Sequence, residues 1–348
     1  MSLRAALGSL ARPLIESVLA AGVGFLFAAV LLVVLGFNPV VALSALLTGS
    51  VGSVDEISVT LGNASPLILT ALTFAVGIRA GIFNIGAEGQ LYVGAAAAIS
   101  VGLIPMPSGL HLFVAAAAAG LAGAAWAIPA FALKAYRGVN EVISTIMLNW
   151  ISYFLILYVA GSFLVGSGGQ ETTITAPVGM RFPILFGNLH LTTAIFFSLA
   201  LAFAFYVYLW LTPSGYEMRA VGLNSVAARF AGISARRSLL YSFILGGVAA
   251  GGAGAIQVLG RPPAFALYTD LGNVISTGFN GIGVALIGRN HPLAIIVAGL
   301  FFGALQTGVT NVQIIAQVPV EIVQIIQGII IIAIAAPEVF RTVVKRKR

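Results

Sequence analysis

Residues 110–133 read LHLFVAAAAAGLAGAAWAIPAFAL and contain no charged side chain. A helix needs about 20 predominantly apolar residues to cross the hydrocarbon core of a bilayer, so this stretch predicts a transmembrane helix. Five further long apolar runs occupy residues 18–37, 142–165, 192–211, 239–258 and 293–309. Strands of a membrane barrel are shorter and alternate apolar with polar residues. The sequence therefore predicts an all-α polytopic membrane protein.

The composition supports this class for the whole chain. Of the 348 residues, 59% are hydrophobic and only 8% are charged, whereas roughly 25% of the residues in soluble domains are charged. No segment has the composition of a soluble domain or a linker, so residues 1–348 are expected to form a single transmembrane domain. The sequence contains no cysteine, which excludes disulfides, thiol catalysis and thiolate metal sites.

Four apolar runs are shorter than a full crossing: residues 66–78, 91–104, 274–287 and 322–336. They must extend into flanking polar residues or enter the bilayer without a straight crossing, so short, broken helices are expected around residues 66–104 and 274–287. Counting all ten runs as spans places every basic residue on the cytoplasmic side except Arg181 and Arg261, out of 17. Because cytoplasmic loops are enriched in Lys and Arg, the sequence predicts about ten transmembrane helices with both termini cytoplasmic.

The two ends and the longest loop have ordinary explanations. Arg4 and Arg12 precede the first apolar run, as in a signal peptide, but a run of about 20 residues exceeds a signal core and predicts an uncleaved first helix. The basic sequence VVKRKR at residues 343–348 is interpreted as a cytoplasmic anchor rather than a nucleic-acid-binding tail. The outside loop at residues 166–190 is rich in Gly and Thr and is expected to hold at most a short surface helix or hairpin.

A search for catalytic motifs is negative. The sequence has no G-x-x-x-x-G-K-[ST] loop for nucleotide phosphates, no H-E-x-x-H and no G-x-S-x-G. Its three histidines, His111, His190 and His291, are assigned to three separate loops and interpreted as interfacial residues. We expect no catalytic residue, no metal and no cofactor, and the chain is not expected to be an enzyme. A pathway, a receptor or a scaffold remains.

Two stretches combine Phe-Asn with closely spaced glycines: GIFNIGAEGQ at residues 81–90 and TGFNGIG at residues 277–283. Transporters place substrate at short, glycine-interrupted helices, because irregular backbone at membrane depth is tolerated only where it is buried or lines a cavity. The stretches are either corresponding elements of two structural repeats or separate helix-packing clusters with a capping Asn. As parts of a substrate path, they contribute the candidates Phe83, Asn84, Glu88, Gln90, Phe279 and Asn280.

A third polar feature lies within a predicted helix. Glu141, Thr145, Asn149 and Ser152 follow one another at steps of four, four and three, which places them on one helix face. Glu141 and Asn149 are therefore further path candidates, although hydrogen bonding between helices would explain the same pattern. Amides and hydroxyls dominate the predicted interior, while Glu88 and Glu141 are assigned to cytoplasmic helix ends. This distribution favours a neutral, hydroxyl-rich solute over proton or sodium coupling.

The cytoplasmic loop at residues 212–237 predicts two short helices. The first spans residues 216–221 and stops at Gly222, and the second spans residues 226–231, capped by Asn224 or Ser225. Val226, Phe230 and Ile233 give the second helix an apolar edge outside the bilayer. Such an edge requires either a protein partner or the membrane surface to cover it.

The sequence GYEMRAVGLNSVAARFAGI at residues 215–233 resembles the coupling loop of ABC importer permeases, in the family that serves ribose and other simple sugars, branched-chain amino acids and nucleosides. Residues 81–90 and the sequence NEVISTIMLN at residues 140–149 are similar to the nucleoside branch. The Asp-Leu-Ser stretch of the sugar branch is absent from the first position. The resemblance spans nearly the whole chain, and the length matches the longer of the two permease subunits in nucleoside systems.

This resemblance implies several roles. Glu217, Arg219, Gly222 and Asn224 would belong to the loop that docks a cytoplasmic ATPase, and residues 83–90 would lie near the translocation path. The expected partners are ATP-binding subunits, a second, similar permease subunit and an extracytoplasmic solute-binding lipoprotein, at the plasma or inner membrane. The predicted function is ATP-driven import of a neutral solute, foremost nucleosides. A simple-sugar or riboflavin ABC permease and an ion-coupled secondary transporter stay open as alternatives.

Overall fold

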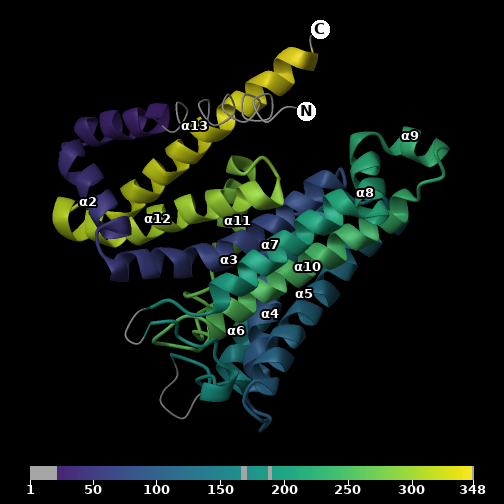
Figure 1. The fold of residues 1–348 in the computed structure, drawn as a ribbon, viewed down its shortest axis with the longest axis horizontal. Helices are drawn as coiled ribbons and strands as arrows, with labels where there is room; N and C mark the ends of the chain where they lie inside the picture. The colour runs from purple at the N-terminus through teal and green to yellow at the C-terminus, as the bar shows by residue number, and fades with distance from the viewer. Residues whose placement is uncertain (1–21, 166–170, 187–189, 347–348) are drawn as a thin grey trace. The chain divides into compact units, whose positions relative to one another are not determined.

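The computed structural model describes residues 22–165, 171–186 and 190–346 (Figure 1). In this part of the chain the regular elements are helices, and extended pairing is limited to three isolated bridges. The chain divides into two compact units, one of residues 58–303 and one of residues 1–57 with 304–348. The expected all-α class is confirmed.

Most helices follow one another along the chain with short connections, and the longer connections lie between α6 and α7 and between α10 and α11. They are Gly22–Val34, α2 (Pro39–Val51), α3 (Val54–Arg79), α4 (Ala87–Val101), α5 (Leu110–Arg137), α6 (Glu141–Phe163), the 3-10 turn η1 (Val178–Met180), α7 (Ala194–Leu211), α8 (Pro213–Leu223), α9 (Ser225–Phe230), α10 (Ala235–Leu259), α11 (Thr277–Ile287), α12 (Pro292–Ala316) and α13 (Val320–Arg346).

Six of the described helices are long and apolar enough to cross a membrane: α3, α5, α6, α7, α10 and α12. Five of them coincide with long runs predicted from the sequence. The sixth predicted run, residues 18–37, is described only as the shorter helix Gly22–Val34. The chain is therefore a multi-pass helical membrane protein.

Helix α3 corrects the expectation of a short, broken helix starting near residue 66. It is a continuous helix of 26 residues that passes through Pro66 and begins at Val54, beyond the polar residues Asp55, Glu56 and Asn63. The apolar run at residues 66–78 thus extends into flanking polar sequence. The sequence pattern also missed α2, a 13-residue helix whose N-terminal amides are capped by the side chain of Asn38. The expected short helices do occur at α4, with 15 residues, and at α11, with 11.

Local signals explain where several helices begin and end. The side-chain oxygens of Asn140, Thr212 and Ser234 accept hydrogen bonds from the first turns of α6, α8 and α10. These caps satisfy amides that have no partner inside the helix. Gly138 ends α5 in the left-handed conformation, at φ 67°, which favours glycine because it lacks a Cβ.

Helix α10 forms the centre of the larger unit and packs on α5 and α4. The contact is made backbone to backbone: a methyl group at Gly251 would lie 2.0 Å from the carbonyl oxygen of Ala119, and one at Gly254 would lie 2.4 Å from that of Leu91. Small residues allow such approach between membrane helices, where van der Waals packing replaces the hydrophobic effect as the driving force. The glycines of α10 therefore fix how deeply α4 and α5 sit against it.

The larger unit has two different ends. Helices α8 and α9 lie at one end of α7 and α10, and residues 171–186 and 260–276 lie at the other (Figure 1). The two arginines that break the charge asymmetry belong to this second end. Arg181 donates to the carbonyl of Ala176 at 2.7 Å and lies 4.5 Å from the ring centroid of Phe265. Arg261 donates to the side-chain oxygen of Asn63.

Candidate functional site

The centre of the larger unit is set by the crossing of α10 and α5. A methyl group at Gly247, in the middle of α10, would lie 2.5 Å from the Cα of Ala124, in the middle of α5. At the adjacent Gly246, a methyl group would lie 3.2 Å from the side-chain nitrogen of Asn84. The non-helical segment between α3 and α4 therefore reaches the middle of the helix bundle, and α4 starts there.

Glu88, in the first turn of α4, caps the N-terminus of α11. Its carboxylate accepts hydrogen bonds from the backbone amides of Ser276 at 2.5 Å, Gly278 at 2.6 Å and Phe279 at 3.1 Å. The hydroxyl of Tyr92, one turn along α4, donates a fourth at 2.5 Å. A carboxylate suits this position because the free amides and the dipole of a helix N-terminus favour negative charge.

This placement corrects the position expected for Glu88. The sequence suggested a cytoplasmic helix end because residue 88 begins a helix, but α4 begins in the middle of the bundle, and the side chain is only 2% exposed. The two Phe-Asn-Gly stretches, far apart in the sequence, thus meet: a methyl group at Gly278 would lie 2.4 Å from the backbone nitrogen of Glu88. Scarcity of buried carboxylates no longer argues against ion coupling.

The amide of Asn149 holds the segment before α4 in shape. Its oxygen accepts from the backbone of Gly89 and its nitrogen donates to the carbonyl of Ile85, both at 2.9 Å. Gly89 permits this approach, since a methyl group there would lie 2.5 Å from the hydroxyl of Ser152. Asn149 and Ser152 are buried, so the polar face predicted on α6 points inward, where it bonds between segments.

Asn84 and Gln90 are buried and only partly satisfied. The Asn84 oxygen accepts from the backbone amide of Gly86 at 3.0 Å, while its nitrogen has no hydrogen-bond partner among the described residues. The Gln90 side-chain oxygen is likewise unpaired within the described residues. A buried polar group without a partner costs roughly 1–3 kcal/mol, so this region of the bundle is prepared for additional hydrogen bonding.

The remaining predicted path residues lie at the edges of this region. Phe83 is 50% exposed and packs edge to face on Phe74, with 5.4 Å between ring centroids. Phe279 is 45% exposed, and Asn280 follows it in α11, half-buried. Glu141 pairs with Lys134 at 2.7 Å and accepts from the backbone amide of Phe83 at 3.4 Å. Tyr92 was missed, although its position four residues after Glu88 places both on one face of α4.

Helices α8 and α9 expose large apolar side chains to the outside of the fold. The exposed fractions are 90% for Phe230, 89% for Leu223, 64% for Val226 and 62% for Tyr216. Of the predicted apolar edge, only Ile233 is half-buried. We call Tyr216, Leu223, Val226 and Phe230 the apolar coupling surface.

The four residues that the resemblance assigns to ATPase docking lie in the loop but are not among these large exposed side chains. Asn224 caps α9 by accepting from Val226 and Ala227, both at 3.0 Å. Gly222 lies within α8 rather than stopping it, against the end of α3. Glu217 and Arg219 are half-buried. Asn224 and Gly222 thus shape the loop, and Asn224 is exposed beside the large apolar side chains.

An aromatic and cationic cluster at the α8 end was not predicted. The guanidinium carbons of Arg79 and Arg219 lie 5.2 and 5.3 Å from the ring centroid of Trp210, and the ring of His291 lies 4.6 Å from it. Burial, followed by the nearby charge of Arg79, lowers the pKa of His291, so this histidine is neutral at physiological pH. Arg79 and His291 are far from Trp210 and Arg219 in sequence, and no spacing rule links them.

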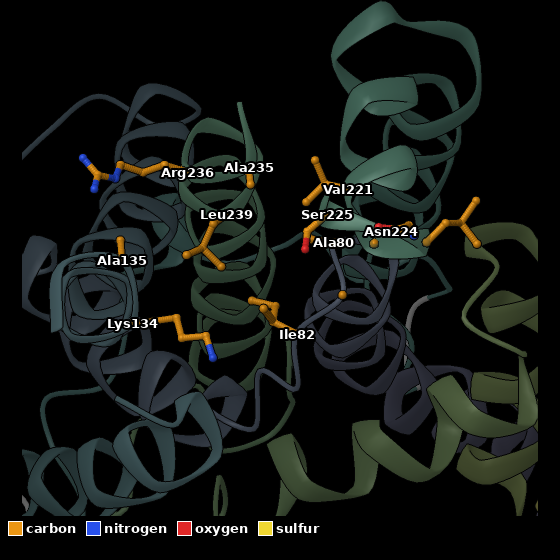
Figure 2. A pocket seen from close by; sticks show the side chains of 13 residues that line it. Ala80, Ile82, Lys134, Ala135, Val221, Asn224, Ser225, Ala235, Arg236 and Leu239 are labelled. Carbon is orange, nitrogen blue, oxygen red and sulfur yellow. The ribbon is translucent and has the colours of Figure 1, made fainter. Parts of the chain in front are cut away.

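A pocket of about 640 Å³ opens between the coupling loop and the ends of α3, α5 and α10 (Figure 2). Ala80 and Ile82 line it from the segment after α3, Val221 and Ser225 from the loop, and Leu239 from α10. Figure 2 shows Lys134 and Arg236 on the α5 and α10 side of this space and Val221 and Ser225 on the other. The pocket lies between the loop and the end of α5, while α8 packs on α10 and its Gly222 lies against the end of α3.

The fold and these two regions are those of a multi-pass membrane permease, with exposed apolar side chains at one end of the larger unit and no catalytic constellation among its described residues. Residues 56–335 match the family model described as "Branched-chain amino acid transport system / permease component". The chain belongs to this family, whose members are transport subunits of ABC transporters rather than enzymes.

Three relatives are similar over most of the chain. The guanosine ABC transporter permease protein NupP of Bacillus subtilis is 34% identical over 95% of this chain and 94% of its own length. The nucleoside ABC transporter permease protein NupB of Lactococcus lactis is 33% identical over 90% of this chain and 88% of its own. The glucose ABC transporter permease protein TsgB13 of Haloferax volcanii is 34% identical over 90% and 84%.

Proposed function

We propose that this chain is the membrane-spanning subunit of an ABC importer for nucleosides. The observation that carries the substrate class is the similarity to the guanosine permease NupP over 95% of the chain. The stretches at residues 81–90 and 140–149 first indicated the nucleoside branch, and residues 84–90 and Asn149 from these stretches meet near the middle of the bundle. A glucose permease is equally identical over a slightly smaller share of the chain, so a sugar is the competing substrate.

The path for the solute runs past the meeting point of α4 and α11. Short helices that end inside a bundle are typical of transporter substrate sites. A nucleoside has sugar hydroxyls and a flat base, so it requires amides for hydrogen bonding and aromatic faces for stacking, which is worth roughly 1–3 kcal/mol per base. Asn84 and Gln90 supply unpaired amide atoms at the centre, and Phe83 and Phe279 supply half-exposed rings at its edges.

The apolar coupling surface is the attachment site for a cytoplasmic ATPase. An exposed apolar patch on a surface that faces water is typical of a protein interaction site. In this patch Leu223 and Phe230 are almost fully exposed. ATP hydrolysis is assigned to that partner. The remaining partners are a second, similar permease subunit and an extracytoplasmic solute-binding lipoprotein, since the family description names one component of a transport system.

The topology proposed for this subunit has ten spans with both termini in the cytoplasm. The charge asymmetry of the sequence supports it. So does the placement of α8 and α9 at the end of the larger unit opposite residues 171–186 and 260–276 (Figure 1). Residues 1–21, which include Arg4 and Arg12, lie outside the described residues.

Uptake by cells or liposomes carrying the complete complex tests the substrate class. Labelled guanosine, uridine, glucose, ribose, riboflavin and leucine are compared, and we expect uptake of nucleosides only. Uptake of glucose or ribose without a nucleoside would contradict the nucleoside assignment and leave the permease assignment in place. Uptake that a protonophore stops while the ATP concentration is maintained would instead favour ion coupling, for which the buried carboxylate of Glu88 is the specific observation.

A further inference from the structure

The coupling loop contacts the segment that leads to Glu88 directly, backbone against backbone. A methyl group at Gly222, in the last turn of α8, would lie 2.2 Å from the carbonyl oxygen of Arg79 and 3.0 Å from the backbone nitrogen of Gly81. In the opposite direction, a methyl group at Gly81 would lie 3.0 Å from the Cα of Gly222. We call this contact the Gly222–Gly81 seam. Two backbones this close leave no flexible side chain between them to absorb a displacement.

The cluster around Trp210 gives the same two elements a second attachment. Arg219 reaches the Trp210 ring from α8, and Arg79 reaches the same ring from the end of α3. The Arg79 guanidinium also donates to the carbonyls of Asn290 at 3.0 Å and Arg289 at 3.2 Å. A cation over an aromatic face is attracted to it, more strongly where water is excluded, so α8 and α3 share one anchor.

The segment held by the seam leads directly to the cap on α11. From Gly81 the chain continues through Phe83 and Asn84 into α4, where Glu88 holds the α11 N-terminus by three amide hydrogen bonds. Asn149 fixes the intermediate backbone at Ile85 and Gly89. Every connection between α8 and α11 is thus a backbone contact, a short stretch of chain or a buried hydrogen bond.

We propose that α8 and the α3–α4 segment move as one rigid body, and that the Gly222–Gly81 seam and the Trp210 cluster transmit motion of the coupling loop through Glu88 to the N-terminus of α11. This rests on the proposed docking of an ATPase at the apolar coupling surface. Gly222, Gly81, Arg79 and Trp210 are positioning residues in this scheme. The pocket beside the seam (Figure 2) is bounded by α5 and by the first turns of α10, and α10 also packs on α8.

The first test adds a methyl group to the seam. Gly222 does not adopt a positive φ, so Gly222→Ala changes the approach distance without straining its own backbone. Gly161→Ala in α6 is the matched control, because a methyl group there meets nothing within 4 Å. In the reconstituted complex, we expect Gly222→Ala to bind the ATPase normally and to lower nucleoside transported per ATP hydrolysed about tenfold, the size of a typical coupling between two sites. A normal ratio in Gly222→Ala would overturn the proposal.

A second test works even where Gly222→Ala folds poorly. The sequence has no cysteine, so Ala80→Cys with Val221→Cys introduces one defined pair in the wall of the pocket. Thiol cross-linkers of graded length are applied to the assembled complex, and the linked fraction is measured by mass spectrometry. A rigid body tolerates the link, so we expect transport to be retained. Loss of transport in the linked fraction, or failure of every linker to react with both thiols, would overturn the proposal.

The two proposals fail in different ways. If the coupling surface does not dock an ATPase, Leu223→Asp with Phe230→Asp leaves ATPase binding unchanged, whatever happens at the seam. If docking is correct but the seam transmits nothing, that double variant loses the ATPase while Gly222→Ala transports normally.

Discussion

The meeting point of α4 and α11 and the apolar coupling surface are opposites. The first is a set of polar groups enclosed by apolar helices, and the second is a set of apolar side chains outside the fold. Each is costly in its surroundings unless it has a partner. At the meeting point the partners are mostly in the same chain, so the groups fix the structure. At the coupling surface the described part of the chain supplies none, so those side chains are available for another subunit.

Replacing Glu88 gives the largest expected effect. Glu88→Leu removes the acceptor for three backbone amides and the hydroxyl of Tyr92, and each stranded donor costs about 1–3 kcal/mol. We expect a strong loss of folded protein, measured as the monodisperse fraction and the thermal midpoint in detergent. Glu88→Gln keeps one acceptor oxygen and is expected to be intermediate. Wild-type stability in Glu88→Leu would show that the cap does not hold α11.

Charging the coupling surface is expected to give the next largest effect, on binding rather than on folding. Leu223→Asp with Phe230→Asp places two carboxylates where an apolar contact is proposed. Because exposed substitutions change stability little, the thermal midpoint should stay unchanged, while affinity for the ATPase falls by about 2–4 kcal/mol, the size of an interface hot spot. Co-purification and titration of the ATPase measure this. Ala227→Asp, which adds one carboxylate at an exposed position of α9 outside the apolar coupling surface, is the comparison variant.

A smaller effect is expected for Asn149, which holds the segment before α4 in place and is also proposed to line the solute path. Asn149→Leu removes two hydrogen bonds from the segment before α4, worth about 1–2 kcal/mol each at most. We expect the maximal uptake rate to fall more than the half-saturating concentration changes, if the proposed solute-binding lipoprotein rather than the permease selects the solute with high affinity. Asn84→Leu should behave alike. A large change in half-saturation alone would instead place these amides in direct solute selection.

The smallest expected effect concerns the ion pair beside the pocket. Lys134 and Glu141 are 2.7 Å apart, with side chains 34% and 14% exposed, and partly exposed pairs contribute about 0–1 kcal/mol. Glu141→Gln should therefore shift the thermal midpoint slightly and leave transport near wild type. A severe loss of transport would show that Glu141 takes part in the solute path rather than lying at its edge.

The sequence predicted five of the six long apolar helices correctly, but it did not predict how deep in the bundle α4 begins. Five long apolar runs became α5, α6, α7, α10 and α12, because hydrocarbon requires long runs without charge. Glu88 was expected at the cytoplasmic end of the bundle because it lies at the start of a helix. It lies in the middle instead, because α4 itself starts there. The depth of α4 depends on where glycines of α10 admit it, and that contact joins residues far apart in the chain.

The same reason explains the uneven result at the candidate site. Asn224 or Ser225 was predicted as the cap of the second short helix, and Asn224 is the cap, since capping depends on neighbours in sequence. The Trp210 cluster could not be predicted, because Arg79, Trp210, Arg219 and His291 come from four separate segments. No periodicity connects them.

The sequence by itself determined the membrane class, five of the long apolar helices, the apolar edge of the loop at residues 212–237 and the absence of a nucleotide-binding motif, because each depends on composition or on neighbouring residues. Only the tertiary structure decided that the two Phe-Asn-Gly stretches meet, that Glu88 caps α11 and that Gly222 lies against Arg79 and Gly81. These contacts depend on how closely helix backbones approach one another. That distance is set by packing across the whole bundle.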